Sequence, residues 1–375
     1  MRTITMNSYY PAHDDYSAHD ARERRRDREI RRARRRRRIM LRRLRLVAVF
    51  AVIALTVTAA FALIDRQPEP TPPAAEVPDE MIMAAVPVLP EVVEPEEPTW
   101  TIHTTENTAQ VSPDFPSQYV LLLDLETGEV LAQRDRTARI NPASMTKILT
   151  LLVSAEHITK GALEMGHFTM TRAVADYTFS NNCSVVGYEV DEVIPAKELF
   201  YGCILCSGAD ACMGLALTVF GSHEAIVEAM NAKLAELGLS ETSHFTNCVG
   251  LYDPDHYTTV EDMAIIMKAA LENEFCREVM STINYQSVPT PQHKDGQVLS
   301  NLFSRRIQYQ DTGAVTVSCA KTGYVEESGF CAASYGENSE GQGFICVTGK
   351  STGTQQSIKD HAALYKAYCP GEIIE

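Results

Sequence analysis

A serine and a lysine stand three residues apart in the stretch NPASMTK, at Ser144 and Lys147. The stretch has the features of a helix start, because Asn141 can cap the helix, Pro142 suits its first turn, and apolar residues then recur at helical spacing. Residues three apart on a helix share a face, so the lysine amine can reach the serine hydroxyl and remove its proton. The free N–H groups of the helix N-terminus would stabilise an oxyanion. The pair can therefore act as a nucleophile and its general base.

A lysine acts as a base only when it is neutral, and burial beside a second cation lowers its pKa in that direction. The tripeptide KTG, formed by Lys321, Thr322 and Gly323 at the end of a strand-like run, supplies such a cation. It also supplies a hydroxyl group and a glycine that lets another backbone approach closely. Ser207, in the stretch CSGADA, lies between the two motifs. Ser-x-x-Lys, a serine motif and KTG in this order are the set found in penicillin-binding proteins and class A β-lactamases.

The elements around these motifs indicate an α+β fold. Two apolar runs flank a turn at residues 126–128, which is the pattern of a β-hairpin. Periodic apolar residues then predict helices within residues 141–158, 196–221, 222–239 and 259–275. Three strand-like runs follow, at residues 314–323, 329–337 and 343–350, before a closing helix at 355–368. Strands at both ends with helices between them favour an antiparallel sheet flanked by helices.

Residues 118–368 resemble the serine D-alanyl-D-alanine carboxypeptidases, the low-molecular-mass penicillin-binding proteins. Three stretches carry the resemblance: DLETGEVLAQRDRTARINPASMTK, FTNCVGLYDPDHYTT and AKTGYVEESGFCAASY. The resemblance implies a β-lactamase/transpeptidase-like fold, which agrees with the order of the elements. It also implies an enzyme that removes the terminal D-alanine from peptidoglycan stem peptides ending in D-Ala-D-Ala. β-Lactam antibiotics would acylate it, and neither a metal nor a cofactor is implied.

The resemblance assigns catalytic roles to three residues. Ser144 would be the acylated nucleophile, and Lys147 would be its general base. Ser207 would relay protons to the leaving group.

The resemblance also implies the substrate-binding residues. Lys321 and Thr322 would hold the terminal carboxylate of the peptide. Lys350 in VTGKST would either add to that site or be a solvated lysine at the end of a strand. The oxyanion hole would consist of the backbone N–H groups of the nucleophile and of Tyr324, next to Gly323.

The middle motif departs from the family pattern. The family usually has SGN, whereas this chain has SGA, with Ala209 in place of an asparagine that orients the substrate and bonds to the lysine base. Asp210 is rotated about 100° further around a helix, so it cannot simply replace that amide. An alternative function is therefore a non-catalytic protein that binds cell-wall peptides. A β-lactamase would need a deacylating carboxylate that the sequence does not identify, and His256 is expected to be structural.

The first 64 residues predict a membrane anchor. Residues 1–45 hold 16 arginines and 6 acidic residues, a net charge of 16 − 6 = +10, whereas the whole chain carries −15. The 19 residues at 46–64 have neither a charge nor a proline, and such a helix spans the ~30 Å hydrocarbon core of a bilayer. Because arginine is retained on the cytoplasmic side, we expect a single-pass signal-anchor in the cell membrane. The N-terminus would be cytoplasmic and the catalytic domain extracellular.

Residues 65–113 are rich in proline and glutamate, which is typical of an extended spacer that cannot bury a core. The catalytic domain would then occupy residues 114–375. The arginine tract RRARRRRR abuts the membrane span, so we expect it to set topology and contact anionic lipid rather than nucleic acid.

All ten cysteines follow this spacer. An even number in an exported domain permits disulfides, but their connectivity cannot be read from the sequence. Cys203 and Cys206 lie in an apolar helical stretch without a second CxxC motif. Buried thiols are therefore an equal alternative to disulfides, and a metal site is not expected.

Overall fold

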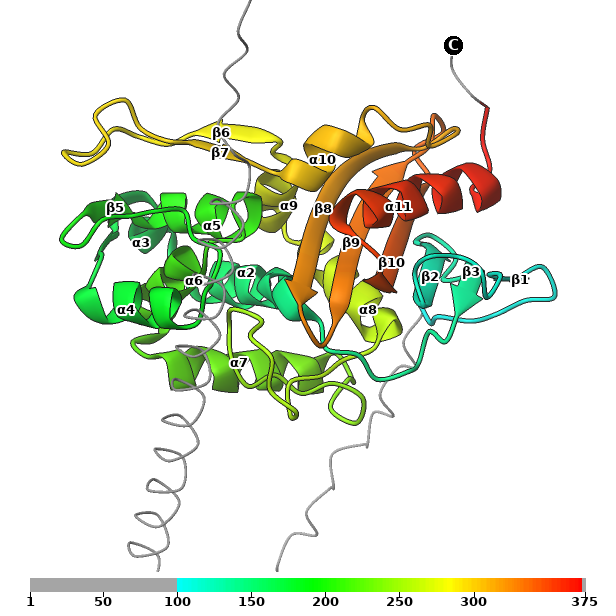
Figure 1. The fold of residues 1–375 in the computed structure, drawn as a ribbon, viewed down its shortest axis with the longest axis horizontal. Helices are drawn as coiled ribbons and strands as arrows, with labels where there is room; N and C mark the ends of the chain where they lie inside the picture. Colours follow the sequence, from blue (N-terminus) through cyan, green and yellow to red (C-terminus); the bar gives the residue numbers. More distant parts are fainter. Residues whose placement is uncertain (1–99, 373–375) are drawn as a thin grey trace, which may run out of the picture. The chain divides into compact units, whose positions relative to one another are not determined.

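The computed structural model describes residues 100–372 of the chain. The predicted basic tail, the predicted membrane helix at 46–64 and the spacer up to residue 99 lie outside the described residues. Within residues 100–372, no helix combines the length and the apolar character that crossing a membrane requires. The fold is a six-stranded sheet with helices on both faces (Figure 1).

The main sheet joins strands from both ends of the described chain. Its order is β1-β3-β2-β10-β9-β8. The strands are β1 (Ala109–Gln110), β2 (Tyr119–Asp124), β3 (Val130–Arg134), β8 (Thr316–Val325), β9 (Gly329–Glu337) and β10 (Gly343–Ser351). Neighbouring strands pair antiparallel, except that β1 runs parallel to β3. The predicted antiparallel sheet is therefore confirmed in its five longer strands, and the two-residue β1 makes the sheet mixed.

Both faces of this sheet are covered, as β2 illustrates. Leu121 and Leu123 pack into the core on the side of the larger helical layer, whereas Val120 and Leu122 pack into a second core on the opposite face. Successive side chains of a strand point to opposite faces, so a strand buried on both sides reads as a continuous apolar run. The second core is closed by α10 (Leu302–Ile307) and α11 (Thr354–Tyr368).

The larger helical layer covers the other face. Its helices are α2 (Thr146–His157), α3 (Lys160–Met165), α4 (Arg172–Ser180), α5 (Ala196–Leu205), α6 (Ala209–Leu215), α7 (His223–Glu236), α8 (Val260–Glu272) and α9 (Glu274–Ser281). A 3-10 turn, η1 (Ala143–Met145), precedes α2, and a π-helical turn, η2 (Ala216–Phe220), follows α6. Two small ribbons complete the fold: β4 (His167–Thr169) with β5 (Val193–Pro195), and β6 (Asn284–Gln286) with β7 (Val298–Ser300). Helix α2 contacts α5, α7, α8 and α9, so it lies at the centre of this layer.

Residues 100–113, which the composition assigns to the end of the spacer, are attached to the sheet. The indole Nε1 of Trp100 donates a hydrogen bond to the Leu125 carbonyl oxygen at 2.9 Å. The N–H of His103 donates to the Gly128 carbonyl oxygen at 3.0 Å. Gly128 has a φ of +78°, and a Cβ there would lie 2.3 Å from the carbonyl oxygen of Thr101, so the close approach requires glycine. The folded body thus includes residues that precede position 114.

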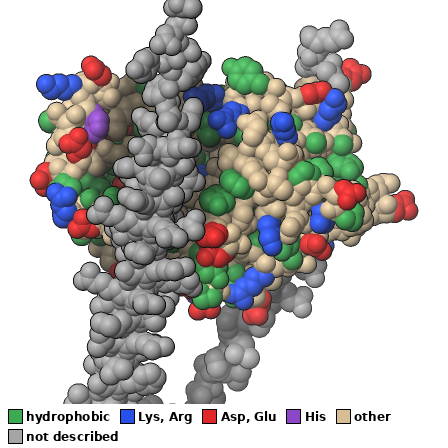
Figure 2. Space-filling model, viewed as in Figure 1, with side chains coloured by type: hydrophobic (Ala, Val, Ile, Leu, Met, Phe, Trp, Pro, Cys, Tyr) green, Lys and Arg blue, Asp and Glu red, His purple; other side chains and the backbone are tan. Residues whose placement is uncertain are grey.

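The described surface carries charges of both signs. On the face seen in Figure 2, basic and acidic side chains are interspersed and form no extended patch of one sign. Lys233, for example, lies between two carboxylates, 2.9 Å from Glu156 and 2.7 Å from Glu236. A polyanion such as nucleic acid is recognised through clustered basic residues, and this face does not present them.

Candidate active site

Ser144 lies in η1, directly before the first turn of α2. The Nζ of Lys147 donates one hydrogen bond to the Ser144 Oγ at 3.0 Å and another to the Val249 carbonyl oxygen at 2.6 Å. Lys147 is buried, at 2% exposure, whereas Ser144 lines a cavity. The serine and lysine are therefore within hydrogen-bond distance, as their helical spacing predicts.

The turn before the nucleophile has an unusual backbone. Ala143 has a φ of +46°, in the left-handed region that non-glycine residues seldom adopt. Asn141, predicted to cap the helix, accepts the Ala143 N–H at 3.0 Å and donates to the His256 carbonyl oxygen at 2.8 Å. It does not bond to the first N–H groups of α2, because η1 intervenes. The asparagine instead fixes the strained turn that presents Ser144.

A second serine–lysine pair faces the first. The Nζ of Lys321 donates to the Ser207 Oγ at 2.9 Å and to the Thr322 carbonyl oxygen at 2.8 Å. Burial, followed by the positive charge of Lys147, lowers the pKa of Lys321 to about 7. Ser207 lies in the break between α5 and α6 with a φ of +55°.

One cavity of about 240 Å³ opens between the two pairs. Five residues predicted for the site line it: Ser144, Ser207, Thr322, Gly323 and Tyr324. Lys147 and Lys321, which are both buried, donate hydrogen bonds to the Ser144 and Ser207 hydroxyls that line the cavity. The structure therefore brings seven of the eight predicted site residues together.

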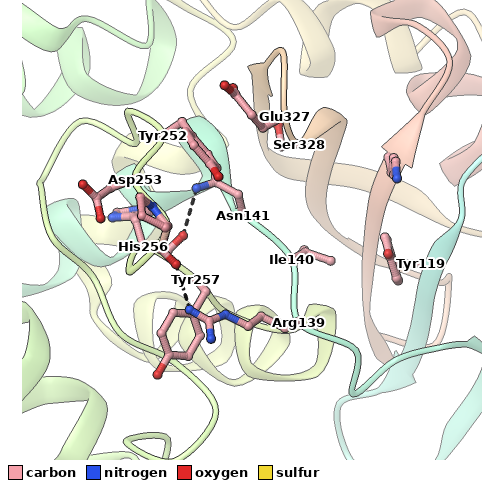
Figure 3. Close-up of a pocket in the computed structure, with 12 residues that line it drawn as sticks. Tyr119, Arg139, Ile140, Asn141, Tyr252, Asp253, His256, Tyr257, Glu327 and Ser328 are labelled. Carbon is pink, nitrogen blue, oxygen red and sulfur yellow. Dashed lines mark hydrogen bonds between the residues drawn. The ribbon is translucent and has the colours of Figure 1, made fainter. Parts of the chain in front are cut away.

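Lys350 is the exception. It lines a neighbouring cavity of about 370 Å³, together with Asn141 and the loop that contains Tyr252 and His256 (Figure 3). The reason lies in the strand order, because Lys350 belongs to β10 and KTG belongs to β8, with β9 between them. The structure thus places Lys350 away from the residues expected to hold the terminal carboxylate.

Two glycines allow backbone segments to press against the nucleophile turn. A Cβ at Gly323 would lie 2.7 Å from the Pro142 carbonyl oxygen and 3.0 Å from the Ser144 nitrogen. A Cβ at Gly250, which has a φ of +78°, would lie 2.0 Å from the Ala143 carbonyl oxygen. Side chains at either position would push the turn away. The edge of β8 therefore approaches the Ser144 N–H, where the oxyanion hole is expected.

His256 stabilises the same turn from inside the protein. Its Nδ1 accepts the Thr246 N–H at 3.0 Å, so in the neutral ring Nε2 carries the proton and donates to the Thr146 Oγ1 at 2.8 Å. The Thr146 hydroxyl in turn donates to the Ala143 carbonyl oxygen at 2.7 Å. Burial lowers the pKa of His256 to about 3, which keeps the ring neutral. This arrangement is a structural support, as expected for His256, and not a base.

Asn247 was not identified from the sequence, although it shapes the site. Its Oδ1 accepts the N–H groups of Gly250 and Leu251 at 2.7 and 2.9 Å, and its Nδ2 donates to the Leu251 carbonyl oxygen at 3.0 Å. These bonds hold the loop whose Val249 carbonyl binds Lys147. An asparagine three residues before a glycine is typical of a turn, so the sequence pattern could have predicted a turn at residues 247–250 but not its contact with Lys147.

Ala209, which stands where the family has an asparagine, brings no amide to the site. A lysine ammonium has three donors, and for Lys147 the described residues provide the two acceptors named above. Asp210 faces away: its carboxylate accepts the N–H groups of Val186 and Gly187 at 2.9 and 3.0 Å. The rotation of about 100° from residue 209 to residue 210 along a helix predicts that the Asp210 side chain points away from the site. Asp210 therefore positions the loop beside the cavity and does not replace the missing asparagine.

All ten cysteines are thiols in the structure. Cys203 on α5 and Cys212 on α6 have their Sγ atoms 3.2 Å apart, on the two helices that flank Ser207. Of the two alternatives left open by the sequence, the structure shows thiols rather than disulfides. Within residues 100–372, no group of three or more His, Cys, Asp or Glu side chains is arranged to hold a metal ion.

Comparison with protein families and curated proteins identifies relatives of this chain. A family described as D-alanyl-D-alanine carboxypeptidase matches residues 105–348. The chain is 32% identical over 239 residues to the D-alanyl-D-alanine carboxypeptidase DacF of Bacillus subtilis, which covers 64% of this chain and 59% of the relative. It is 36% identical over 163 residues to DacB2 of Mycobacterium tuberculosis, covering 43% of this chain and 53% of the relative. The matches thus span little more than half of these relatives.

Solved structures agree on the fold. A D-alanyl-D-alanine carboxypeptidase from Mycobacterium tuberculosis has a TM-score of 0.58 and 25% identity, covering 68% of this chain and 92% of that chain. A DD-transpeptidase from Streptomyces has a TM-score of 0.58 and 24% identity, covering 68% and 97%. The sheet and its helices therefore form the fold of the DD-peptidases and DD-transpeptidases. Because the family match extends over well more than half of the sequence, the chain belongs to the D-alanyl-D-alanine carboxypeptidase family.

Proposed function

We propose that this protein is a serine-type D-Ala-D-Ala carboxypeptidase that removes the terminal D-alanine of peptidoglycan stem peptides through an acyl-enzyme on Ser144. The observation that carries the proposal is the convergence of two Ser–Lys pairs on one cavity, with N–O distances of 3.0 Å for Lys147 and Ser144 and 2.9 Å for Lys321 and Ser207. Membership of the family supports the choice of reaction.

In the acylation step, the amine of Lys147 acts as the general base and takes the Ser144 proton while the serine oxygen bonds to the carbonyl carbon of the scissile amide. The carbonyl electrons move to its oxygen, which the N–H groups of Ser144 and Tyr324 stabilise. When the tetrahedral intermediate collapses, the C–N bond breaks and the proton that Lys147 took from Ser144 passes through Ser207 to the amine of D-alanine. Lys147 is then ready to act as a base again. The products are free D-alanine and an ester on Ser144.

In the deacylation step, water replaces the departed amine. Lys147 removes a proton from the water as its oxygen attacks the ester carbonyl, and the serine oxygen leaves with a proton returned to it. During acylation, the hydroxyl of Thr322 and the ammonium of Lys321 hold the terminal carboxylate of the substrate, which then departs with the D-alanine. A β-lactam would follow the first step alone, because its opened ring keeps the leaving group attached and blocks water.

The non-catalytic alternative rests on Ala209, because the amide that would fix the lysine base is absent. The family relatives, which are named as carboxypeptidases, do not favour it. Lys147 is already held by the Val249 carbonyl and buried. This support positions the amine toward Ser144 without the amide.

We also propose that residues 46–64 anchor the protein in the cell membrane, with residues 1–45 in the cytoplasm and the catalytic domain outside. The support is the uncharged 19-residue run and the arginine-rich segment that precedes it. Protease added to intact spheroplasts should digest the catalytic domain and leave a tag on residue 1 intact. Protection of the domain would contradict this topology.

The function is tested with the full chain in detergent. Intact-mass spectrometry after incubation with benzylpenicillin should show one adduct, which Ser144→Ala abolishes. In parallel, the wild type should release D-alanine from a peptide ending in D-Ala-D-Ala. An adduct without D-alanine release would favour the binding-only alternative, and the absence of an adduct would refute Ser144 as the nucleophile.

A further inference from the structure

The cavity that contains Lys350 adjoins the active site and has no assigned role. Its volume of about 370 Å³ lies within the range of small-molecule sites, about 300–1,000 Å³. The cavity at Ser144, at about 240 Å³, lies below that range. The smaller cavity therefore accommodates only the end of a substrate, and the rest of a longer substrate must extend beyond it.

Two segments of chain connect the cavities. Along the nucleophile turn, Ser144 lines the first cavity and Asn141 the second. From the end of β8 into the turn that follows it, Tyr324 lines the first and Glu327 the second. In both segments the two lining residues are only three positions apart, so the two cavities adjoin.

The charges around the second cavity cancel. Two basic side chains, Arg139 and Lys350, are matched by two acidic ones, Asp253 and Glu327, and the pKa of His256 is lowered to about 3, so that ring is neutral. The lining therefore gives no electrostatic preference for an anion or a cation.

The lining is also rich in hydroxyl groups. The phenols of Tyr119, Tyr252 and Tyr257 form no hydrogen bond with any residue of the described chain, 100–372. These phenols remain available both to donate and to accept hydrogen bonds. A neutral ligand with many hydroxyl groups matches this lining.

Aromatic rings flank the cavity. Tyr252 is 48% exposed, although it is a large aromatic residue. Figure 3 shows Tyr252 on the loop side of the cavity and Tyr119 on the strand side. The Tyr257 ring is covered instead by the Arg139 guanidinium, 3.2 Å from the ring centroid. A tyrosine ring presents an apolar face and a polar tip, which suits the C–H face and the hydroxyl groups of a sugar.

We infer that the second cavity binds a sugar residue of the glycan to which the stem peptide is attached. The inference rests on the proposed function, because the glycan is attached to the same peptide whose end Ser144 would attack, and the second cavity adjoins the first. It follows that the enzyme prefers stem peptides that still carry their sugars over free peptides of the same sequence.

The test compares two substrates for the full chain in detergent: a free peptide ending in D-Ala-D-Ala, and the same peptide attached to its disaccharide of N-acetylated amino sugars. We expect kcat/KM to be about tenfold higher for the glycosylated substrate, through a lower KM. Tyr252→Ala should reduce this ratio toward one, and Tyr252→Phe should retain most of it because the ring remains. Tyr309→Ala is the matched control, since Tyr309 is 83% exposed and does not line the cavity.

Equal kcat/KM values for the two substrates with the wild type would overturn the inference while leaving the carboxypeptidase intact. A preference that survives both Tyr252→Ala and Tyr119→Ala would overturn the location. If neither substrate releases D-alanine, the proposed function fails, and binding of a tetramer of β-1,4-linked N-acetylglucosamine decides the inference separately. Calorimetric binding that Tyr252→Ala abolishes would support the sugar site, and no binding at millimolar tetramer would refute it.

Discussion

The Nζ of Lys321 lies 2.9 Å from the Ser207 Oγ, although 114 positions separate the two residues in the chain. The lysine is buried at 2% exposure and lies close enough to Lys147 for the two charges to repel. Burial and this repulsion lower the pKa of Lys321 to about 7. The cation expected to hold the substrate carboxylate therefore loses its charge near neutral pH, whereas an ordinary lysine keeps it to much higher pH.

This relationship predicts the pH dependence of the enzyme. The protonated form of Lys321 exists below its pKa of about 7 and is lost as the pH rises. Because kcat/KM reports the ionisation of the free enzyme, it should fall on the alkaline side, by up to about tenfold per pH unit. Lys321→Arg, which stays charged, should remove the limb near pH 7 even if its overall rate is lower. A wild-type profile that stays flat to pH 9 would contradict the assignment.

The position of Ala209 predicts a gain of function. Lys147 has one donor without an acceptor among the residues named in the site, and an asparagine amide at 209 would supply that acceptor. Ala209→Asn should therefore raise the rate of D-alanine release several-fold by fixing the amine toward Ser144. Ala209→Val is the control for added volume, because it brings no amide. If Ala209→Asn releases D-alanine no faster than Ala209→Val, the amide does not assist the reaction in this site.

Two buried histidines predict acid sensitivity. Burial lowers the pKa of both His256 and His361 to about 3 in the folded protein, from the ordinary value of 6.5. Between these values the unfolded chain binds protons that the folded chain does not, so the free energy of unfolding falls as pH falls from about 6.5 toward 3. Each histidine contributes up to about 1.4 kcal/mol per pH unit. Urea denaturation between pH 7 and 4.5 measures this slope.

A matched variant separates this effect from general acid denaturation. His361 bonds to the hydroxyls of Ser334 and Thr348 at 2.7 and 2.9 Å, and its ring packs against Phe303 of the second core. His361→Gln should lower stability at pH 7, where the histidine bonds are lost, and should flatten the slope at acid pH. An unchanged slope would mean that the buried ring does not control the pH dependence.

The parts of the site that the sequence predicts are those governed by local spacing. Ser144 and Lys147 meet because residues three apart share a helix face, and Asp210 points away from the site for the same reason. The position of Lys350 could not be predicted in this way, because it depends on β9 lying between β8 and β10. Strand order in a sheet is set by long-range pairing, which no motif records.

The contacts that hold the nucleophile turn in place could not be predicted from local sequence spacing either. His256 reaches Ala143 through the Thr146 hydroxyl only after a loop more than 100 residues away folds against α2. Similarly, β1 has just two residues, so it carries no alternating pattern, and its pairing with β3 became visible only in the structure. The fold class followed from long periodic elements, whereas these contacts follow from tertiary packing.

The cysteines predict a simple labelling pattern. Seven of the ten are buried, and Cys183, Cys206 and Cys369 are partly exposed. A thiol reacts as the thiolate, and burial raises the pKa of Cys183 and Cys206. In the folded protein, a thiol-specific disulfide reagent at pH 8 should therefore modify at most three cysteines, slowly, and all ten after denaturation. Fewer than ten in the denatured, unreduced chain would reveal a disulfide.

Asp210 predicts a link between stability and substrate binding. Its buried carboxylate accepts N–H groups from Val186 and Gly187, which hold the loop containing the cavity residue Ser184. In Asp210→Asn, the amide nitrogen cannot accept one of these bonds, and a hydrogen bond to a charged group contributes about 1.5–3 kcal/mol. The free energy of unfolding should fall by about that amount, and KM should rise because the loop borders the cavity.

Asp191→Asn, at an exposed position, is the control and should change neither quantity. If Asp210→Asn lowers stability but leaves KM unchanged, the loop does not contact the substrate.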